Sequence, residues 1–364
     1  MRLNTATIAV TGLNVADNPQ PGLSVGRCLL AGQPGPRALV GVTYDINWTA
    51  VHASEVFQAV YLVPPPWLDD SAFVEGLLMV CREARLTALV PLLEADVTVL
   101  ARHRAALATA HVRVIGPTQE MLASMLDFWR SGSGNRMNVL VPRSAVANAP
   151  DGIAAAAATV GYPLLLCALS GETATAANFL EAQVIGGRFF RWWGGPLVLR
   201  AHVPGEEYQV AAVARGGILI AAVAVKSLAQ GGNGSTWAVV TVADNELLRL
   251  TRALVRHLHW TGALTLKFVK ESWSARVWLV GASSCLPVWV GVTRAVGQNL
   301  PALALRAALA GKPAPAQRLP DYKPGVMLAL TSRDDISDVS ALAMLSTTGK
   351  LVFNGHAASQ KQVG

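Results

Sequence analysis

Hydroxyl and thiol side chains that follow one another late in the sequence could supply a nucleophile. These are Ser283, Ser284 and Cys285, but nucleophilic catalysis also needs a base that an acid orients. No histidine–acid pair can be placed beside them from the sequence. His257 and His259 are separated by one residue, whereas metal-binding histidines on a helix prefer a spacing of three or four. These histidines are therefore expected to complement the charge at the C-terminal end of a helix.

The overall charge favours anionic partners. The chain has 364 residues, a net charge of +7 and a pI near 9.5, and a basic balance attracts nucleotides, phosphates or carboxylates. The cations are scattered, without a Lys/Arg run or a nucleic-acid-binding signature, so no nucleic-acid partner is expected. The cysteines lie far apart, which predicts neither a zinc site nor a disulfide framework and fits a cytoplasmic protein. They are Cys28, Cys81, Cys167 and Cys285.

An apolar stretch over residues 153–169 is interrupted by Gly161-Tyr162-Pro163. A membrane-spanning helix needs ~20 apolar residues in a row, so this stretch instead predicts a helix over 153–160 and a strand over 164–167. No membrane partner is expected. Hydrophobic residues make up 52% and charged residues 15% of the chain, which is typical of a globular protein with two or three linked lobes.

Strands alternate with helices over the first third of the chain, which predicts a parallel sheet in a Rossmann-like lobe that ends near residue 117. The expected strands are 8–12, 38–42, 59–63, 88–92 and 112–115, and the expected helices are 23–30, 73–85 and 97–107. The next segment predicts a helix over 120–129, a strand over 139–142 and a helix over 151–160 with Asp151 as its N-cap.

After residue 167 the pattern changes to strand-like runs separated by glycine turns, which indicates a mostly antiparallel sheet. The expected strands are 197–201, 208–214, 218–226, 237–241, 264–268 and 276–280, and the expected helices are 246–257 and 300–310. Trp192 and Trp193 are expected in a turn that exposes them, where they could contact a partner.

The order of these lobes, together with several local motifs, resembles the ATP-grasp superfamily, in its carbamoyl-phosphate-synthetase-like branch of carboxylate–amine ligases. The motifs are Thr11-Gly12 followed by Gly22 to Arg27, Tyr61 to Pro64, Val141-Pro142-Arg143, Val160 to Pro163, Val203-Pro204-Gly205-Glu206-Glu207-Tyr208, and Gly297 to Pro301. The resemblance implies an α/β chain of four parts. They are a Rossmann-like pre-ATP-grasp domain (1–117), a small α/β subdomain (118–190), an antiparallel α+β subdomain (191–320) and a C-terminal extension (321–364).

ATP-grasp ligases activate a carboxylate as an acyl phosphate that an amine attacks, and phosphoryl transfer needs cations and a metal at the phosphates. The chain departs from the family at the positions that the resemblance implies for these groups. They hold Phe128 and Cys167 for lysines, Ala201 for the glutamate at the adenine, and Lys267, Val280 and Ala282 for metal ligands. Valine and alanine offer Mg²⁺ no side-chain oxygen, so magnesium is not expected, while ATP is kept as a candidate ligand.

Five residues are candidates for nucleotide binding. Glu207 matches the acid that the family uses near the ribose, and Lys267, with Lys226 and Arg200 nearby, could place a cation where the metal would sit. Gly171 is the single glycine in a loop that the family fills with glycines, so the loop is a poor phosphate cradle. The alternatives are a solvated turn residue for Glu207 and solvent-facing or locally paired strand residues for the three cations.

Three functions remain open. The first is a catalytically degenerate ATP-grasp protein, a pseudoenzyme that serves a biosynthetic pathway as a subunit binding a partner protein or a small anion. The second is an active ATP-dependent carboxylate–amine ligase with non-standard contacts to ATP and metal. The third is a purely structural scaffold subunit. Ligand binding separates the first from the third, and ADP release separates the second from both. Exposed apolar surface also allows a homodimer.

Overall fold

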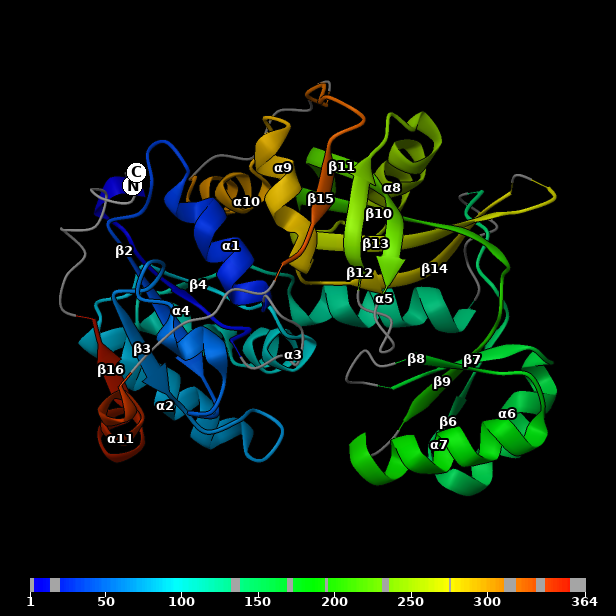
Figure 1. Cartoon of the computed structure of the whole chain (residues 1–364), viewed down its shortest axis with the longest axis horizontal. Coiled ribbons are helices and arrows are strands. Elements are labelled where there is room, and N and C mark those ends of the chain that lie inside the picture. Colours follow the sequence, from blue (N-terminus) through cyan, green and yellow to red (C-terminus); the bar gives the residue numbers. More distant parts are fainter. Residues whose placement is uncertain are drawn as a thin grey trace.

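The described residues form three sheets, two with six strands and one with four. The structure, a computed structural model, describes residues 3–13, 20–131, 138–168, 173–193, 196–230, 236–274, 276–310, 319–331 and 338–353. Figure 1 shows the N-terminal lobe at the left, the antiparallel lobe at the upper right and the small lobe at the lower right. The predicted α/β architecture, with a parallel-rich lobe, a small α/β lobe and an antiparallel lobe, is confirmed.

The N-terminal lobe is built on parallel strands in the order β3-β2-β1-β4-β5. The strands are β1 (Thr7–Val10), β2 (Ala38–Thr43), β3 (Ala59–Leu62), β4 (Ala88–Val90) and β5 (Arg113–Val114). The helices are α1 (Pro21–Leu30), α2 (Asp70–Glu83), α3 (Glu94–Arg102) and α4 (Arg104–Thr109), with 3-10 turns η1 (Leu3–Thr5) and η2 (Thr49–His52). The predicted single helix over 97–107 is wrong, because His103 leaves helical geometry and separates α3 from α4.

The small lobe carries a sheet in the order β6-β9-β7-β8, with antiparallel pairs. Its elements are β6 (Ser144–Ala147), η4 (Pro150–Gly152), α6 (Ile153–Val160), β7 (Leu164–Cys167), β8 (Thr173–Ala176), α7 (Phe179–Trp193) and β9 (Leu197–Ala201). The preceding helix α5 (Gln119–Ser131) packs instead on the antiparallel lobe, in whose core Phe128 is buried. Helices α6 and α7 cover one face of this sheet around Leu164, Leu166 and Leu199.

Three predictions for this lobe are wrong. Residues 139–142 form no strand, since only Leu140 makes an isolated bridge, to Trp278. Asp151 is not the N-cap of α6, because it lies in the turn η4 and Gly152 precedes the helix. Trp192 is exposed as expected, but it ends the unpredicted helix α7 rather than lying in a turn.

The antiparallel lobe has the strand order β14-β13-β10-β11-β12-β15. Its strands are β10 (Gly205–Arg215), β11 (Ile218–Gln230), β12 (Thr236–Thr241), β13 (Gly262–Glu271), β14 (Val277–Ser283) and β15 (Met327–Ala329). One face packs on α8 (Asn245–His257), and His257 lies in its last turn as expected. The other face shares a core with β1 and α1, to which η5 (Val288–Val290), α9 (Gly291–Ala295) and α10 (Leu300–Leu309) contribute.

The predicted domain boundaries stay predictions, but the pairing of strands near them shows to which sheet each strand belongs. β9 pairs within the small sheet although the predicted division placed it in 191–320. In the C-terminal extension, α11 (Val339–Thr348) leads to β16 (Lys350–Val352), which joins β3 at the edge of the N-terminal sheet. No helix among the described residues is long and apolar enough to cross a membrane.

Candidate functional site

Lys267 is an exposed cation on the sheet face that, further along, packs against the N-terminal lobe. It lies on β13 opposite Gln209 of β10 and Gly281 of β14. Ala263, two side chains along the same face, packs in the core shared with the N-terminal lobe. A Cβ at Gly281 would lie 3.4 Å from that of Lys267, so the lysine stem runs across the glycine. Within the described part of the chain, no hydrogen bond or ion pair engages its ammonium group.

The residue that faces Lys267 across the strands is neutral and already saturated. Gln209 is buried, and its Oε1 accepts a hydrogen bond of 2.9 Å from Trp289 Nε1. Its Nε2 donates to Thr236 Oγ1 at 2.6 Å. Because these bonds fix the amide, the surface beneath Lys267 is held rigid without a counter-charge.

Lys226 and Glu207 are paired with neighbours at the same end of the sheet. Lys226 Nζ lies 2.5 Å from Glu206 Oε1, and the hydrogen bond that Lys226 donates lowers the pKa of Glu206. Glu207 accepts a hydrogen bond from Gln230. Lys226 is in register with Tyr208, which packs on the α8 side, so Lys226 and Lys267 point to opposite faces. The structure therefore does not bring these two lysines together.

Arg200 lies on the small sheet, on the face away from α6 and α7. Its Nη2 donates to Cys167 Sγ at 3.0 Å, so a guanidinium group meets the strand end at which the resemblance implies a lysine. Arg200 of β9 therefore places a cation next to Cys167 of β7, the position at which a lysine is expected. Gly171 lies outside the described residues.

Metal-binding side chains do not gather around these cations in the ranges that the structure describes. There, no group of three His, Cys, Asp or Glu side chains lies close enough together to hold a metal ion. The cysteines are free, and all but Cys167 are buried. Burial raises the pKa of the Cys285 thiol well above its usual value, so Cys285 is a poor nucleophile.

A second polar cluster, absent from the sequence prediction, joins the N-terminal and antiparallel lobes. Glu94 begins α3 directly after β4, and its carboxylate accepts three hydrogen bonds from the end of β14. Ser283 Oγ donates at 2.6 Å, the Ser284 backbone N–H at 2.8 Å and Ser284 Oγ at 2.5 Å. The two serines that looked like nucleophiles thus bind a carboxylate of another lobe.

Asp96, two residues after Glu94 on α3, is fully buried on the N-terminal-lobe side of this junction. Thr11 Oγ1 and Tyr44 OH each donate to its carboxylate at 2.5 Å. Burial raises its pKa from about 3.9 to about 6, against the lowering effect of these hydroxyls. Glu94 and Asp96 lie in the first turn of α3, the helix that follows β4 at the carboxyl edge of the parallel sheet. Two acids at such a place are a sequence pattern that could have revealed this cluster.

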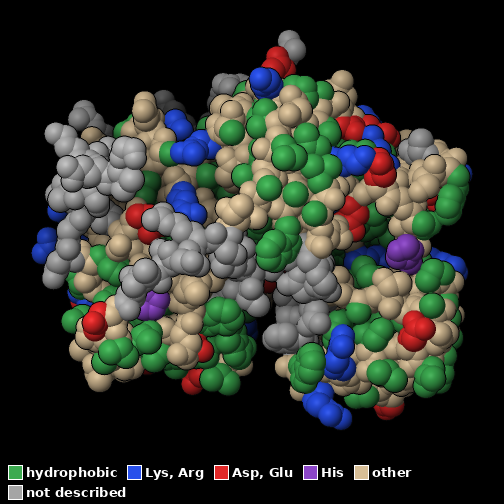
Figure 2. Space-filling model, in the orientation of Figure 1, with side chains coloured by type: hydrophobic (Ala, Val, Ile, Leu, Met, Phe, Trp, Pro, Cys, Tyr) green, Lys and Arg blue, Asp and Glu red, His purple; other side chains and the backbone are tan. Residues whose placement is uncertain are grey.

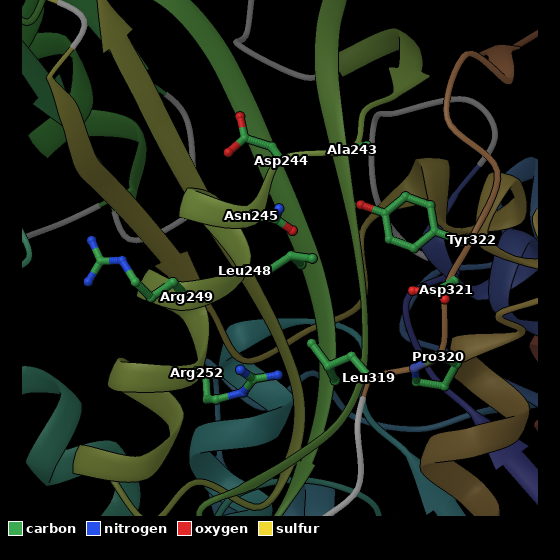
Figure 3. A pocket seen from close by; sticks show the side chains of 10 residues that line it. All are labelled: Ala243, Asp244, Asn245, Leu248, Arg249, Arg252, Leu319, Pro320, Asp321 and Tyr322. Carbon is green, nitrogen blue, oxygen red and sulfur yellow. The ribbon is translucent and has the colours of Figure 1, made fainter.

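A hollow of about 410 Å³ opens elsewhere, between the start of α8 and residues 319–322. Figure 3 shows Arg249 and Arg252 on its helical side and Tyr322 opposite. Tyr322 is tied down by the hydrogen bond that it donates to Val242 O. Because none of the candidate residues lines this hollow, it does not extend the site around Lys267.

Comparisons with known proteins establish the fold. Neither a scan against protein-family models nor a search of the curated proteins finds a match. Among solved structures, a biotin carboxylase from Campylobacter jejuni in a beta-gamma-ATP complex aligns with a TM-score of 0.64 and 14% identity, over 88% of this chain and 74% of that one.

Two further structures are similar over most of their length. The biotin carboxylase domain of Hydrogenobacter thermophilus 2-oxoglutarate carboxylase, a dimer with MgADP and bicarbonate, has a TM-score of 0.63 and 15% identity over 85% of this chain and 70% of that one. An L-amino acid ligase from Bacillus licheniformis has a TM-score of 0.59 and 14% identity over 84% and 74%. These are ATP-grasp proteins, and this chain has the ATP-grasp fold.

Proposed function

We propose that this ATP-grasp-fold chain binds a small anion, such as a nucleotide, without a metal ion, and that it acts as a non-catalytic subunit in a biosynthetic pathway. The observation that carries the proposal is Lys267. Its ammonium group is exposed and makes no hydrogen bond or ion pair with the described residues, at a position where the family's metal-binding acid is expected. A cation fixed there repels a second cation and attracts an anion.

The neighbouring residues support an anion rather than a metal. Gly281 leaves the stem of Lys267 room on one side, and Gln209 on the other side is neutral and held by Trp289 and Thr236. On β14 the residue in register with Lys267 is Gly281, which has no side chain to offer an oxygen ligand. Ala282 pairs with Leu266 and packs on the opposite, α8 side of the sheet. Arg200, on the exposed face of the small sheet, is a second cation that could contact the same ligand.

Isothermal titration with ATP tests the proposal, because two of the similar structures contain adenine nucleotides. Binding is expected in EDTA and no tighter in Mg²⁺. Lys267→Ala should weaken it by about ten- to a hundredfold, as expected for the loss of one hydrogen bond to a charged group. Lys226→Ala is the matched control, because that lysine faces the other way and pairs with Glu206.

The other outcomes decide between the alternatives. No heat with ATP in either buffer would overturn the proposal and favour a structural scaffold. Binding that requires Mg²⁺, accompanied by release of ADP on adding carboxylates and amines, would overturn it in favour of an active ligase.

A further inference from the structure

Helix α7 presents an apolar stripe to the outside of the small lobe. Leu180 and Val184 are 71% and 66% exposed, and the same row continues with half-buried Gly187 and exposed Arg191. The spacing of four, three and four residues is that of the a and d positions of a coiled coil. Figure 2 shows hydrophobic and Lys/Arg side chains together on the lobe at the lower right, which Figure 1 identifies as the small lobe.

The opposite side of α7 already serves the core of the lobe. Ala182 and Phe189 are buried there, and a Cβ at Gly186 would lie 2.5 Å from Ile153 Cδ1 of α6. The outer stripe is therefore separate from the side of α7 that packs in the core of the lobe. Exposed apolar side chains that lie next to one another in this way are typical of interaction sites.

If two copies of α7 packed antiparallel, the charged side chains beside the stripe would meet opposite charges of the other copy. Glu181, near the start of α7, and Arg188, one heptad later, lie on the same flank of the stripe. In an antiparallel helix pair, equivalent heptad positions on this flank face each other across the two helices. Glu181 of one copy therefore meets Arg188 of the other, and the two-fold axis repeats this pair. In a parallel pair Arg188 would instead face Gln183, and Glu181 would face the position of Ala176, which precedes the helix, so neither would meet an opposite charge.

The side chains are free to make these contacts. The carboxylate of Glu181 caps its own helix by accepting from Ala177 N and Asn178 Nδ2, which leaves lone pairs for a guanidinium group. Arg188 lies over the rings of Phe189 and Trp192, which hold it at the edge of the stripe. Gly187 has no atom within 4 Å of its Cβ position, so a partner helix can approach closely there.

We infer that two copies of this chain associate through α7, antiparallel, with Val184 packing against Gly187 of the second copy at the centre. This interaction is independent of anion binding at Lys267. The contact of one helix pair is small, so the dimer should form with a dissociation constant in the range of about 1–100 μM.

Sedimentation velocity of the full chain across that concentration range tests the inference. The wild-type chain should shift from monomer to dimer, and Val184→Glu should weaken dimerisation more than about a hundredfold by placing two like charges at the centre. Met79→Glu is the matched control, since Met79 is 67% exposed on α2 and should leave the dimer unchanged. Circular dichroism should show both variants folded.

Charge exchange tests the antiparallel register. Arg188→Glu should weaken the dimer, and combining it with Glu181→Arg should restore it. A wild-type chain that stays monomeric, a Val184→Glu chain that still dimerises, or an exchange that restores nothing in a folded double variant would each overturn the inference.

Discussion

Charged side chains have different partners at the junction between the N-terminal and antiparallel lobes and at the exposed end of the antiparallel sheet. At the junction, the carboxylates of Glu94 and Asp96 are held by hydroxyl and backbone donors from several elements. At the exposed end, Lys267 has no partner among the described residues, and Lys226 is paired only with its surface neighbour Glu206.

This difference separates stability from binding. A buried polar group that loses its partner keeps the full cost of desolvation, whereas an exposed group recovers its hydrogen bonds from water. We therefore expect substitutions at the junction to lower the free energy of unfolding and substitutions at the exposed end to affect ligands alone.

Asp96→Ala should have the largest effect. It leaves the buried hydroxyls of Thr11 and Tyr44 without an acceptor and should lower the free energy of unfolding by about 2–4 kcal/mol, measured by urea denaturation. Asp151→Ala is the control, since this exposed residue does not cap α6 and should cause no measurable change. Equal effects of the two substitutions would remove the distinction between the regions.

The charge on Asp96 should also make stability depend on pH. Its folded-state pKa of about 6 lies above the unfolded value of about 3.9. The folded protein therefore binds this proton more tightly, and the favourable contribution is lost as pH rises through 6. Between pH 4 and 7 the free energy of unfolding should fall by up to about 3 kcal/mol relative to Asp96→Asn. If the difference in the free energy of unfolding between the two proteins stayed constant across that range, the raised pKa of the buried Asp96 carboxyl would be contradicted.

Glu94→Ala should have an intermediate effect, because its cluster is only partly buried and water can replace the carboxylate. We expect a loss of about 1–2 kcal/mol in the free energy of unfolding, with a smaller loss for Glu94→Gln, which keeps an acceptor oxygen. Denaturation of both variants beside Asp96→Ala checks the order. A loss larger than that of Asp96→Ala would mean that the exposed edge of the junction holds the lobes together.

Lys226→Ala should have the smallest effect. Its ion pair with Glu206 lies at the surface, where screening and side-chain entropy cancel most of the attraction. The midpoint of thermal melting should stay within about 2 °C of the wild type. A larger drop would show that the exposed end contributes to the fold and would narrow the contrast between the two regions.

The sequence predicts the fold well where its pattern is local. Buried apolar strands alternating with helices indicate the parallel lobe, and glycine turns mark the antiparallel strands. Helix α7 was not predicted: Trp192 and Trp193 next to Gly194-Gly195 indicated a turn, whereas the structure has a helix whose Gly186 packs closely on Ile153. The contact of Glu94 with Ser284 joins residues 190 positions apart, and no local pattern specifies which distant strand end a helix start will meet.

Among the candidate site residues, the sequence identified Lys267 because its position matches a motif, and the structure describes it as exposed. Local pairing of Lys226 was one of the sequence-based alternatives, but its partner Glu206, and Gln230 as the partner of Glu207, could not be identified from the sequence. The pairing depends on the register of β10 with β11 and on which side chains share a face. Whether any of these residues contacts a nucleotide stays a prediction.

The central claim, that Lys267 attracts an anion where a metal would otherwise be held, is tested most directly by charge reversal at that position. Melting temperatures of the wild type and of Lys267→Glu would be measured with ATP, first in EDTA and then in Mg²⁺. A ligand that binds the folded state raises the melting temperature by mass action. We predict a rise for the wild type that is as large in EDTA as in Mg²⁺, and none for Lys267→Glu in EDTA. A wild-type rise that appears only with Mg²⁺ would contradict the account.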